Sequence, residues 1–139
     1  MKKISIGIAI LVTAFRLTGS APEEIPAAKQ WNDPARFARS STGEMVIFKG
    51  ETENSVRFDV SFKPGSKNNW CYPQMKLKKD EEIPAGTVLQ FDFKAEAPDG
   101  ELKCDYVLLI LNPGNIRCRL PIPKKEWQTV TIDLSKLTE

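Results

Sequence analysis

The chain of 139 residues carries 20 basic and 18 acidic side chains, a formal net charge of +2, and it contains no histidine. This near balance, without a long basic run, argues against nucleic acid as a main partner, because nucleic acid is bound by clustered positive charge. A zinc site is disfavoured by the lack of histidine and of any Cys-x-x-Cys spacing. We therefore expect no metal and no other cofactor.

The first 21 residues have the layout of a secretion signal peptide. Lys2 and Lys3 form a basic start, residues 4–15 form an apolar run, and small side chains follow at residues 18–21. The apolar run is too short to span a bilayer. We therefore expect residues 1–21 to be cleaved, which leaves a secreted or periplasmic protein of bacterial type without membrane contact.

A hydrophobic pattern of period two returns from residue 44 to residue 134 and predicts β-strands. We expect residues 22–30 to be a linker and residues 31–139 to form one all-β module. Strands are predicted, in chain order, at residues 44–49, 55–62, 70–78, 87–96, 102–111, 116–122 and 126–134, with a further short strand within residues 31–41.

The alternation also predicts which side of each strand is buried. Val56 and Phe58 share one side of their strand, and Leu89 and Phe91 do the same in theirs, while polar side chains lie between them. The continuous apolar run at residues 106–111 instead predicts a central strand that is covered on both faces. Short connections between such strands favour an antiparallel β-sandwich.

The three cysteines, Cys71, Cys104 and Cys118, allow at most one internal disulfide bond. A turn at residues 112–115 lies between the last two of them. If Leu111 faces Ile116 across this turn, Cys118 lies opposite Leu109, so that a bond between Cys104 and Cys118 would need a shifted register. Buried free thiols are therefore expected.

Three segments together resemble a known family. Trp-x-Tyr-Pro at residues 70–73 is followed by Leu-x-Phe-Asp-Phe-Lys-Ala at residues 89–95 and by Trp-Gln-Thr-Val-Thr-Ile-Asp-Leu-Ser at residues 127–135. In this order they resemble the jelly-roll, galactose-binding-like carbohydrate-binding modules of bacterial polysaccharide-degrading enzymes. The resemblance covers most of the chain from about Trp31 onward.

This resemblance implies an antiparallel β-sandwich of jelly-roll type that binds a polysaccharide or oligosaccharide, with a glycoside hydrolase as a further candidate partner. Modules of this type usually continue past the closing tryptophan strand with one or two more strands. The resemblance therefore also implies a module that lacks its last strand, or that takes this strand from a neighbour.

Sugar recognition typically places a flat aromatic ring against a pyranose, with polar side chains that bond the surrounding hydroxyl groups. Trp70 and Tyr72 share one side of their predicted strand, about 7 Å apart by strand rise. The predicted ligand-binding residues are Trp70, Tyr72, Gln74, Arg57, Asp59, Gln90, Asp92, Arg117 and Arg119. Two alternatives remain open: the rings cap a core, or the charges form ordinary cross-strand pairs, Arg57 with Asp59 and Arg117 with Asp92.

Catalysis has little support in the sequence. The chain lacks the Glu-x-Asp-x-x-Glu strand motif of sandwich glucanases, the histidine common in sandwich lyases, and the Gly-x-Ser-x-Gly elbow of serine hydrolases. We therefore expect a non-catalytic binding module with no catalytic residues. The alternative is a structural or protein-interaction β-sandwich of a cell-surface or secreted assembly.

Overall fold

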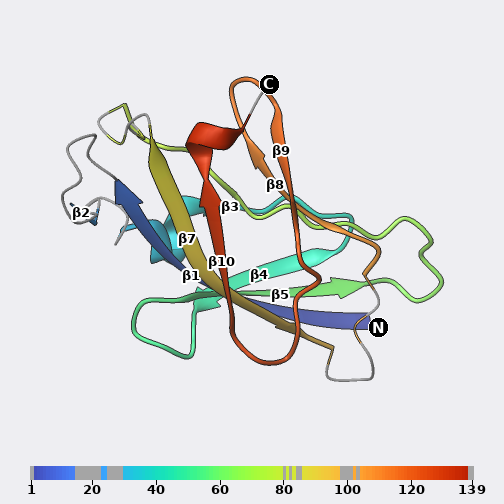
Figure 1. Cartoon of the computed structure of the whole chain (residues 1–139). Coiled ribbons are helices and arrows are strands. Elements are labelled where there is room, and N and C mark those ends of the chain that lie inside the picture. Colours follow the sequence, from blue (N-terminus) through green and yellow to red (C-terminus); the bar gives the residue numbers. More distant parts are fainter. Residues whose placement is uncertain are drawn as a thin grey trace.

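The computed structural model describes residues 30–79, 81, 83, 86–97, 102 and 104–137 in full, and the backbone alone of residues 2–14 and 23–24. The described chain is built from antiparallel strands and short 3-10 turns, which confirms the predicted all-β class (Figure 1). The strands are β1 (Lys2–Ala14), β2 (Glu23–Glu24), β3 (Phe37–Ala38), β4 (Glu44–Lys49), β5 (Val56–Phe62), β6 (Gln74–Met75), β7 (Thr87–Glu96), β8 (Val107–Leu111), β9 (Ile116–Leu120) and β10 (Gln128–Asp133), and the turns are η2 (Pro34–Arg36) and η3 (Leu134–Lys136).

Most strands belong to one six-stranded antiparallel sheet, with the order β10, β7, β1, β5, β4 and with β2 paired to the end of β1. The strands β4 and β7 have the bounds that the sequence pattern predicts. The strands β5, β9 and β10 lie within their predicted ranges and are shorter. The antiparallel strands β7 and β10 are seen next to each other in Figure 1.

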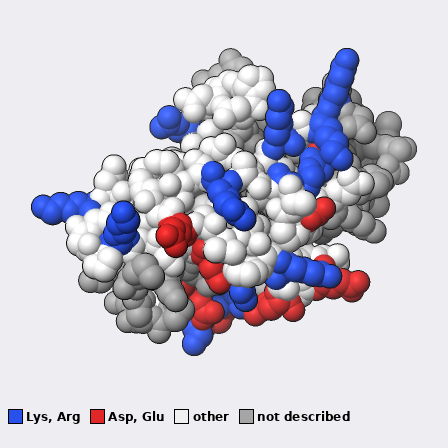
Figure 2. Space-filling view, turned by 180° about the vertical axis from the view of Figure 1, so that it is seen from behind, with Lys and Arg blue, Asp and Glu red and all other residues white. Residues whose placement is uncertain are grey.

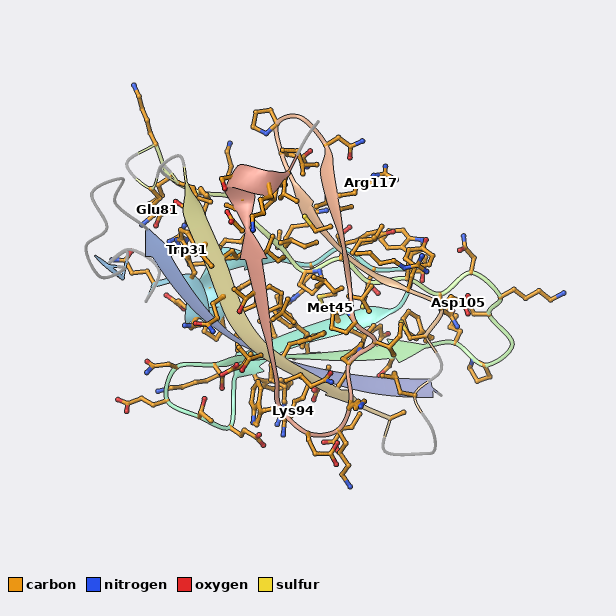
Figure 3. All side chains as sticks on the ribbon, in the orientation of Figure 1. Trp31, Met45, Glu81, Lys94, Asp105 and Arg117 are labelled. Atoms are coloured by element: carbon orange, nitrogen blue, oxygen red, sulfur yellow. The ribbon has the colours of Figure 1, made fainter. Side chains whose placement is uncertain are left out.

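One face of this sheet is buried, as the alternation predicts. Val56, Phe58 and Val60 of β5 are fully buried, and the inward residues of β7 form a second buried row beside Trp31. At about 25 cal/mol per Å² of apolar surface removed from water, such rows supply most of the favourable free energy of folding. Figure 3 labels Trp31 and Met45, one from each of the two clusters that make up the core.

Two small sheets, β3–β6 and β8–β9, lie over this buried face, and we call them the covering sheets. Phe37 of β3 meets the ring of Phe58 edge-on, with 5.0 Å between ring centroids and 74° between ring planes. Met75 of β6 and Leu109 of β8 pack against the cluster around Phe91. The side chains that point away from these contacts therefore form the outer side of the covering sheets.

The segment from Trp70 to Met75 forms a shorter strand than the predicted 70–78. Met75 lies opposite Phe37, and an isolated bridge joins Cys71 to Ser41 in the same register. Pro73 stands between these two paired sections. Because proline has no backbone N–H to donate, it interrupts the ladder, and only Gln74–Met75 remains a regular strand.

The hairpin of β8 and β9 has the register that the sequence predicts, with Leu111 opposite Ile116 and Leu109 opposite Cys118. The prediction that residues 106–111 form a central strand covered on both faces is wrong. Within the described residues β8 pairs with β9 alone, and all five of its residues are half-buried. Tyr106, directly before the strand, is 54% exposed.

The N-terminal segment lies in the middle of the six-stranded sheet. The strand β1 falls within the expected signal peptide, yet its backbone pairs with β5 on one side and with β7 on the other. Of the expected linker at residues 22–30, only the pair Glu23–Glu24 of β2 and Gln30 lie within the described residues. No helix in the described part of the chain is long and apolar enough to cross a membrane.

Candidate ligand-binding face

The aromatic pair Trp70 and Tyr72 stands on the outer side of the covering sheets. The two rings are stacked, with 5.0 Å between their centroids and 29° between their planes. Tyr72 is 41% exposed, and Trp70 is half-buried. Neither ring is sealed inside the core, so the pair presents aromatic surface to solvent.

The backbone around these rings is held by the neighbouring segment. The N–H of Tyr72 donates to the carbonyl of Ser40 at 2.6 Å, and the N–H of Thr42 donates to the carbonyl of Trp70 at 3.0 Å. The hydroxyl of Thr42 also accepts from the N–H of Trp70 at 3.0 Å. Cys71, between the two rings, packs against the core cluster of β4 and β5. This alternation turns both rings outward.

Three polar residues of the predicted site accompany the rings on this outer side. Gln74 is exposed and alternates with the inward Met75. Arg117 and Arg119 are exposed on β9, where the residue between them, Cys118, is buried. Arg117 Nε donates to Asn115 Oδ1 at 3.3 Å. The structure thus brings an aromatic pair, an amide and two guanidinium groups to one side of the molecule.

Tyr106 belongs to the same side, although the sequence analysis does not include it among the site residues. It stands one position before Val107, which pairs with Leu120 on the inward side of the hairpin. The parity of the run could have identified it, since residues 106, 108 and 110 alternate with the inward residues 107, 109 and 111.

The four remaining predicted residues lie elsewhere, on the outer face of the six-stranded sheet. Arg57 and Asp59 alternate with the buried residues of β5, and Gln90 and Asp92 alternate with those of β7. Because the covering sheets lie over the buried face, these four side chains point away from the aromatic pair. The nine predicted residues therefore divide between two opposite surfaces.

Each of these four residues has a partner on its own face. Arg57 Nε lies 3.2 Å from Asp59 Oδ1, and its guanidinium carbon lies 4.6 Å from the ring centroid of Phe48. Asp92 accepts a hydrogen bond from the hydroxyl of Thr129. Arg57 and Asp59 do form a charge pair, but it lies within the single strand β5 and not across two strands as predicted. The Arg117–Asp92 alternative is wrong, because the two residues lie on different sheets and face opposite sides.

Trp127 closes one end of the same outer face. Its Nε1 donates to Glu51 Oε1 at 2.9 Å, and Lys94 Nζ lies 5.1 Å from the ring centroid. Lys94 also forms an ion pair with Glu51. The hydrogen bond from Lys94, followed by that from Trp127, lowers the pKa of Glu51. These contacts give Trp127 a packing role at a corner of the sheet.

Arg36 and Glu81 form a buried ion pair with two contacts, at 2.6 Å and 2.8 Å. The hydrogen bond from Arg36, with a second from the backbone N–H of Lys78, lowers the pKa of Glu81 to about 2. This ion pair links the turn η2 to the chain after β6 and therefore has a structural role. Within the described residues, no group of three or more histidine, cysteine, aspartate or glutamate side chains could hold a metal ion.

The cysteines Cys71, Cys104 and Cys118 are free thiols, as expected. Cys118 is buried as expected, whereas Cys71 and Cys104 are only half-buried. Burial raises the pKa of all three, and the nearby Cys104 contributes to the shift at Cys71. Since a raised pKa keeps a thiol protonated at neutral pH, these groups are weak nucleophiles.

Charge is mixed across the surface. On the side of the molecule shown in Figure 2, basic and acidic side chains stand near one another along the lower edge, with uncharged surface between the remaining basic groups. Figure 3 shows Arg117 and Lys94, on β9 and β7, in well-separated parts of the molecule.

Comparison with protein-family models, curated proteins and solved structures finds no match for this chain.

Proposed function

We propose that the protein is a non-catalytic carbohydrate-binding module, and that the stacked pair Trp70–Tyr72 is its contact surface for a polysaccharide or oligosaccharide. In this proposal the six-stranded sheet and the covering sheets form an antiparallel β-sandwich of jelly-roll type. The observation that carries the proposal is the exposure of the pair, since Tyr72 is 41% exposed on a backbone that is hydrogen-bonded to the neighbouring segment 40–42. A ring that only capped the core would be covered.

The chemistry of the surface suits a sugar. The apolar face of a pyranose packs against a flat aromatic ring, and removing both from water favours the contact. Because the two rings are stacked, each covers part of the other, and in this proposal a sugar unit packs against the aromatic surface that stays exposed, chiefly that of Tyr72. Gln74 supplies both a donor and an acceptor, and Arg117 and Arg119 supply donors, which hydroxyl groups need once they lose water.

The division of the predicted residues alters the site that we propose. The ligand-binding set is Trp70, Tyr72, Gln74, Arg117 and Arg119, with Tyr106 added because of its exposure. Arg57, Asp59, Gln90 and Asp92 are left out because they lie on the opposite surface. An open surface with few polar contacts favours modest affinity, with dissociation constants from millimolar to micromolar, or binding free energies of about −4 to −8 kcal/mol.

Partner and location follow from the sequence expectations. The protein would act outside the cytoplasm, secreted or periplasmic, and a glycoside hydrolase would supply the catalysis that this chain is not expected to perform. No nucleic acid and no membrane is expected as a partner, since the chain lacks clustered positive charge.

The test is isothermal calorimetry and affinity electrophoresis of the full chain against a polysaccharide panel. Tyr72→Ala and Trp70→Ala should each weaken binding about fivefold or more, because a stacking contact on an aromatic side chain is worth on the order of 1–3 kcal/mol and about 1.4 kcal/mol is tenfold in affinity. Phe48→Ala is the matched control, since Phe48 is 39% exposed but lies on the other surface. Unchanged binding in both site variants, with unchanged circular dichroism, would refute the proposed site.

A second candidate is a structural or protein-interaction sandwich of a surface assembly. It is favoured by Val46 and Phe48, which are 46% and 39% exposed on β4, the last strand of the sheet order within the described residues. An edge strand with exposed apolar side chains can pair with another chain. Loss of partner binding in Phe48→Ala, together with no sugar binding by the parent chain, would select this candidate.

A further inference from the structure

The strand β1 occupies the central position of the six-stranded sheet, between β5 and β7 (Figure 1). Its backbone pairs with β5 from Lys2 opposite Phe62 to Ile8 opposite Val56, and with β7 from Ser5 opposite Glu96 to Ala14 opposite Thr87. Because both neighbours are antiparallel to β1, they run parallel to each other, and without β1 each would have an unpaired edge.

The register places most of the apolar positions of β1 opposite buried residues of β5 and β7. Ile6 lies opposite Phe58 of β5 and opposite Ala95 of β7, and both of these partners are buried. The same holds along the middle of the strand, where Ile4, Ile8, Ile10 and Val12 also lie opposite buried residues, while at its two ends Lys2 and Ala14 lie opposite the buried Phe62 and Thr87. The intervening positions 5, 7, 9 and 13 are serine, glycine, alanine and threonine, and position 11 is leucine. Branched apolar residues at every second position are typical of a strand with one buried face.

The same residues are expected to be removed as a signal peptide. Cleavage after residue 21 would take away β1 and expose the facing edges of β5 and β7 along with part of the buried face. A sheet opened at its centre in this way offers main-chain hydrogen bonds on both sides and apolar contacts below, which are the requirements for binding an added strand.

We propose that the position between β5 and β7 is a strand-acceptor site. After signal cleavage, an extended segment of another polypeptide takes the place of β1, antiparallel to both neighbours and with branched apolar residues at alternate positions. Every mature copy of this chain would lack residues 1–21, so a second copy could not supply the same segment. A foreign partner strand is therefore the occupant that we assign.

The first experiment tests the register in the full chain by amide hydrogen exchange. One double variant carries Ile6→Asn and Ile8→Asn, at positions opposite buried residues. The matched control carries Ser5→Asn and Ala9→Asn, at positions opposite Asp59 and Asp92. The first variant should lose at least tenfold protection in β5 and β7, and the control should keep it. Equal protection in both variants would overturn the proposal.

The second experiment tests exchange of the strand. A site-specific protease sequence is placed between residues 15 and 22 of the full chain, and the folded protein is nicked there. The nicked protein is unfolded in urea and refolded by dilution with an excess of a fluorescent peptide of residues 2–14. We expect this peptide to co-elute with the rest of the chain at one per molecule. The peptide with the control substitutions should compete with it, whereas the peptide with Ile6→Asn and Ile8→Asn should compete at least tenfold more weakly.

Three outcomes would count against the acceptor site. Equal competition by both peptides would mean that register does not select the strand. The absence of peptide binding would mean that the position is not an acceptor. Refolding to an unchanged urea midpoint after the cleaved N-terminal fragment has been removed, with no peptide added, would mean that no strand is needed. A dimer of the mature chain that blocks peptide binding would assign the position to a second copy and would overturn the choice of a foreign partner. None of these outcomes depends on sugar binding, so the two proposals fail separately.

Discussion

Phe58→Ala provides a direct test of how the covering sheets lie over the six-stranded sheet. The side chain of Phe58 is fully buried, and its ring meets Phe37 of β3 edge-on at 5.0 Å. Replacing a buried phenylalanine with alanine costs about 3–5 kcal/mol through lost burial and the cavity left behind. Because an edge-to-face aromatic contact adds about 0.5–1.5 kcal/mol, we expect the upper part of this range.

The assay is urea-induced unfolding at constant pH. With a slope of about 2 kcal/mol per molar urea, a loss of about 4 kcal/mol lowers the unfolding midpoint by about 2 M. Phe48→Ala is the matched control, since Phe48 is 39% exposed on the other face of the same sheet and contacts Arg57. This control should cost about 1 kcal/mol or less, or about 0.5 M in the midpoint.

A domain of ordinary stability has only about 5–15 kcal/mol in total, so that Phe58→Ala can leave too little folded protein to measure. Phe58→Leu then replaces it, with an expected cost of about 1.5 kcal/mol. If Phe58→Leu and Phe58→Ala each cost no more than Phe48→Ala, Phe58 is not covered by β3, and the arrangement of the sheets described above is wrong.

Three further predictions concern single residues. Because the pKa of Glu81 in the folded protein is about 2, below the ordinary 4.5, its ion pair stabilises the fold fully above pH 4.5, and this contribution is lost as the pH falls toward 2. Glu81→Gln should flatten that part of a plot of unfolding midpoint against pH, and an unchanged plot would contradict a stabilising role for the Arg36–Glu81 ion pair. Gly43→Ala should lower the free energy of unfolding by about 1–3 kcal/mol in urea unfolding, because a Cβ atom there would collide with the backbone oxygen of Ser61. A loss below about 0.5 kcal/mol would mean that Gly43 does not lie so close to Ser61 of β5. Cys118 should be the last of the three thiols to react with a thiol reagent in the native protein, as followed by mass spectrometry of the labelled peptides, because it is buried with a raised pKa; early labelling of Cys118 would contradict the packing of the β8–β9 hairpin.

The buried side of each strand could be predicted from the sequence because apolar and polar residues alternate along the strand. Phe91 and Phe93 alternate with Gln90 and Asp92 in the chain, and the structure buries the first two and exposes their polar neighbours to a greater degree. The same rule correctly placed Cys118 opposite Leu109, since the turn at residues 112–115 fixed the register of the hairpin.

The position of β1 could have been anticipated but was hidden by a second pattern in the same residues. Isoleucine at positions 4, 6, 8 and 10 has the period of a strand, and a signal peptide is also apolar over this length. Composition alone does not separate the two uses. The period separates them, because a strand with one buried face places its branched residues at every second position, whereas an apolar signal sequence has no such requirement.

The predicted site residues were wrongly grouped for a different reason, and the alternation within single strands could not have prevented this error. Alternation tells which side of its own sheet a residue faces, and it says nothing about which way that sheet faces in the molecule. Tyr72 and Asp59 are both outward residues by this rule. They belong to sheets that share a core, so their outward directions are opposite. To assign them to opposite surfaces, one must know that residues 37–42 pair with residues 70–75, and this pairing joins segments about 30 residues apart whose only regular strands, β3 and β6, have two residues each.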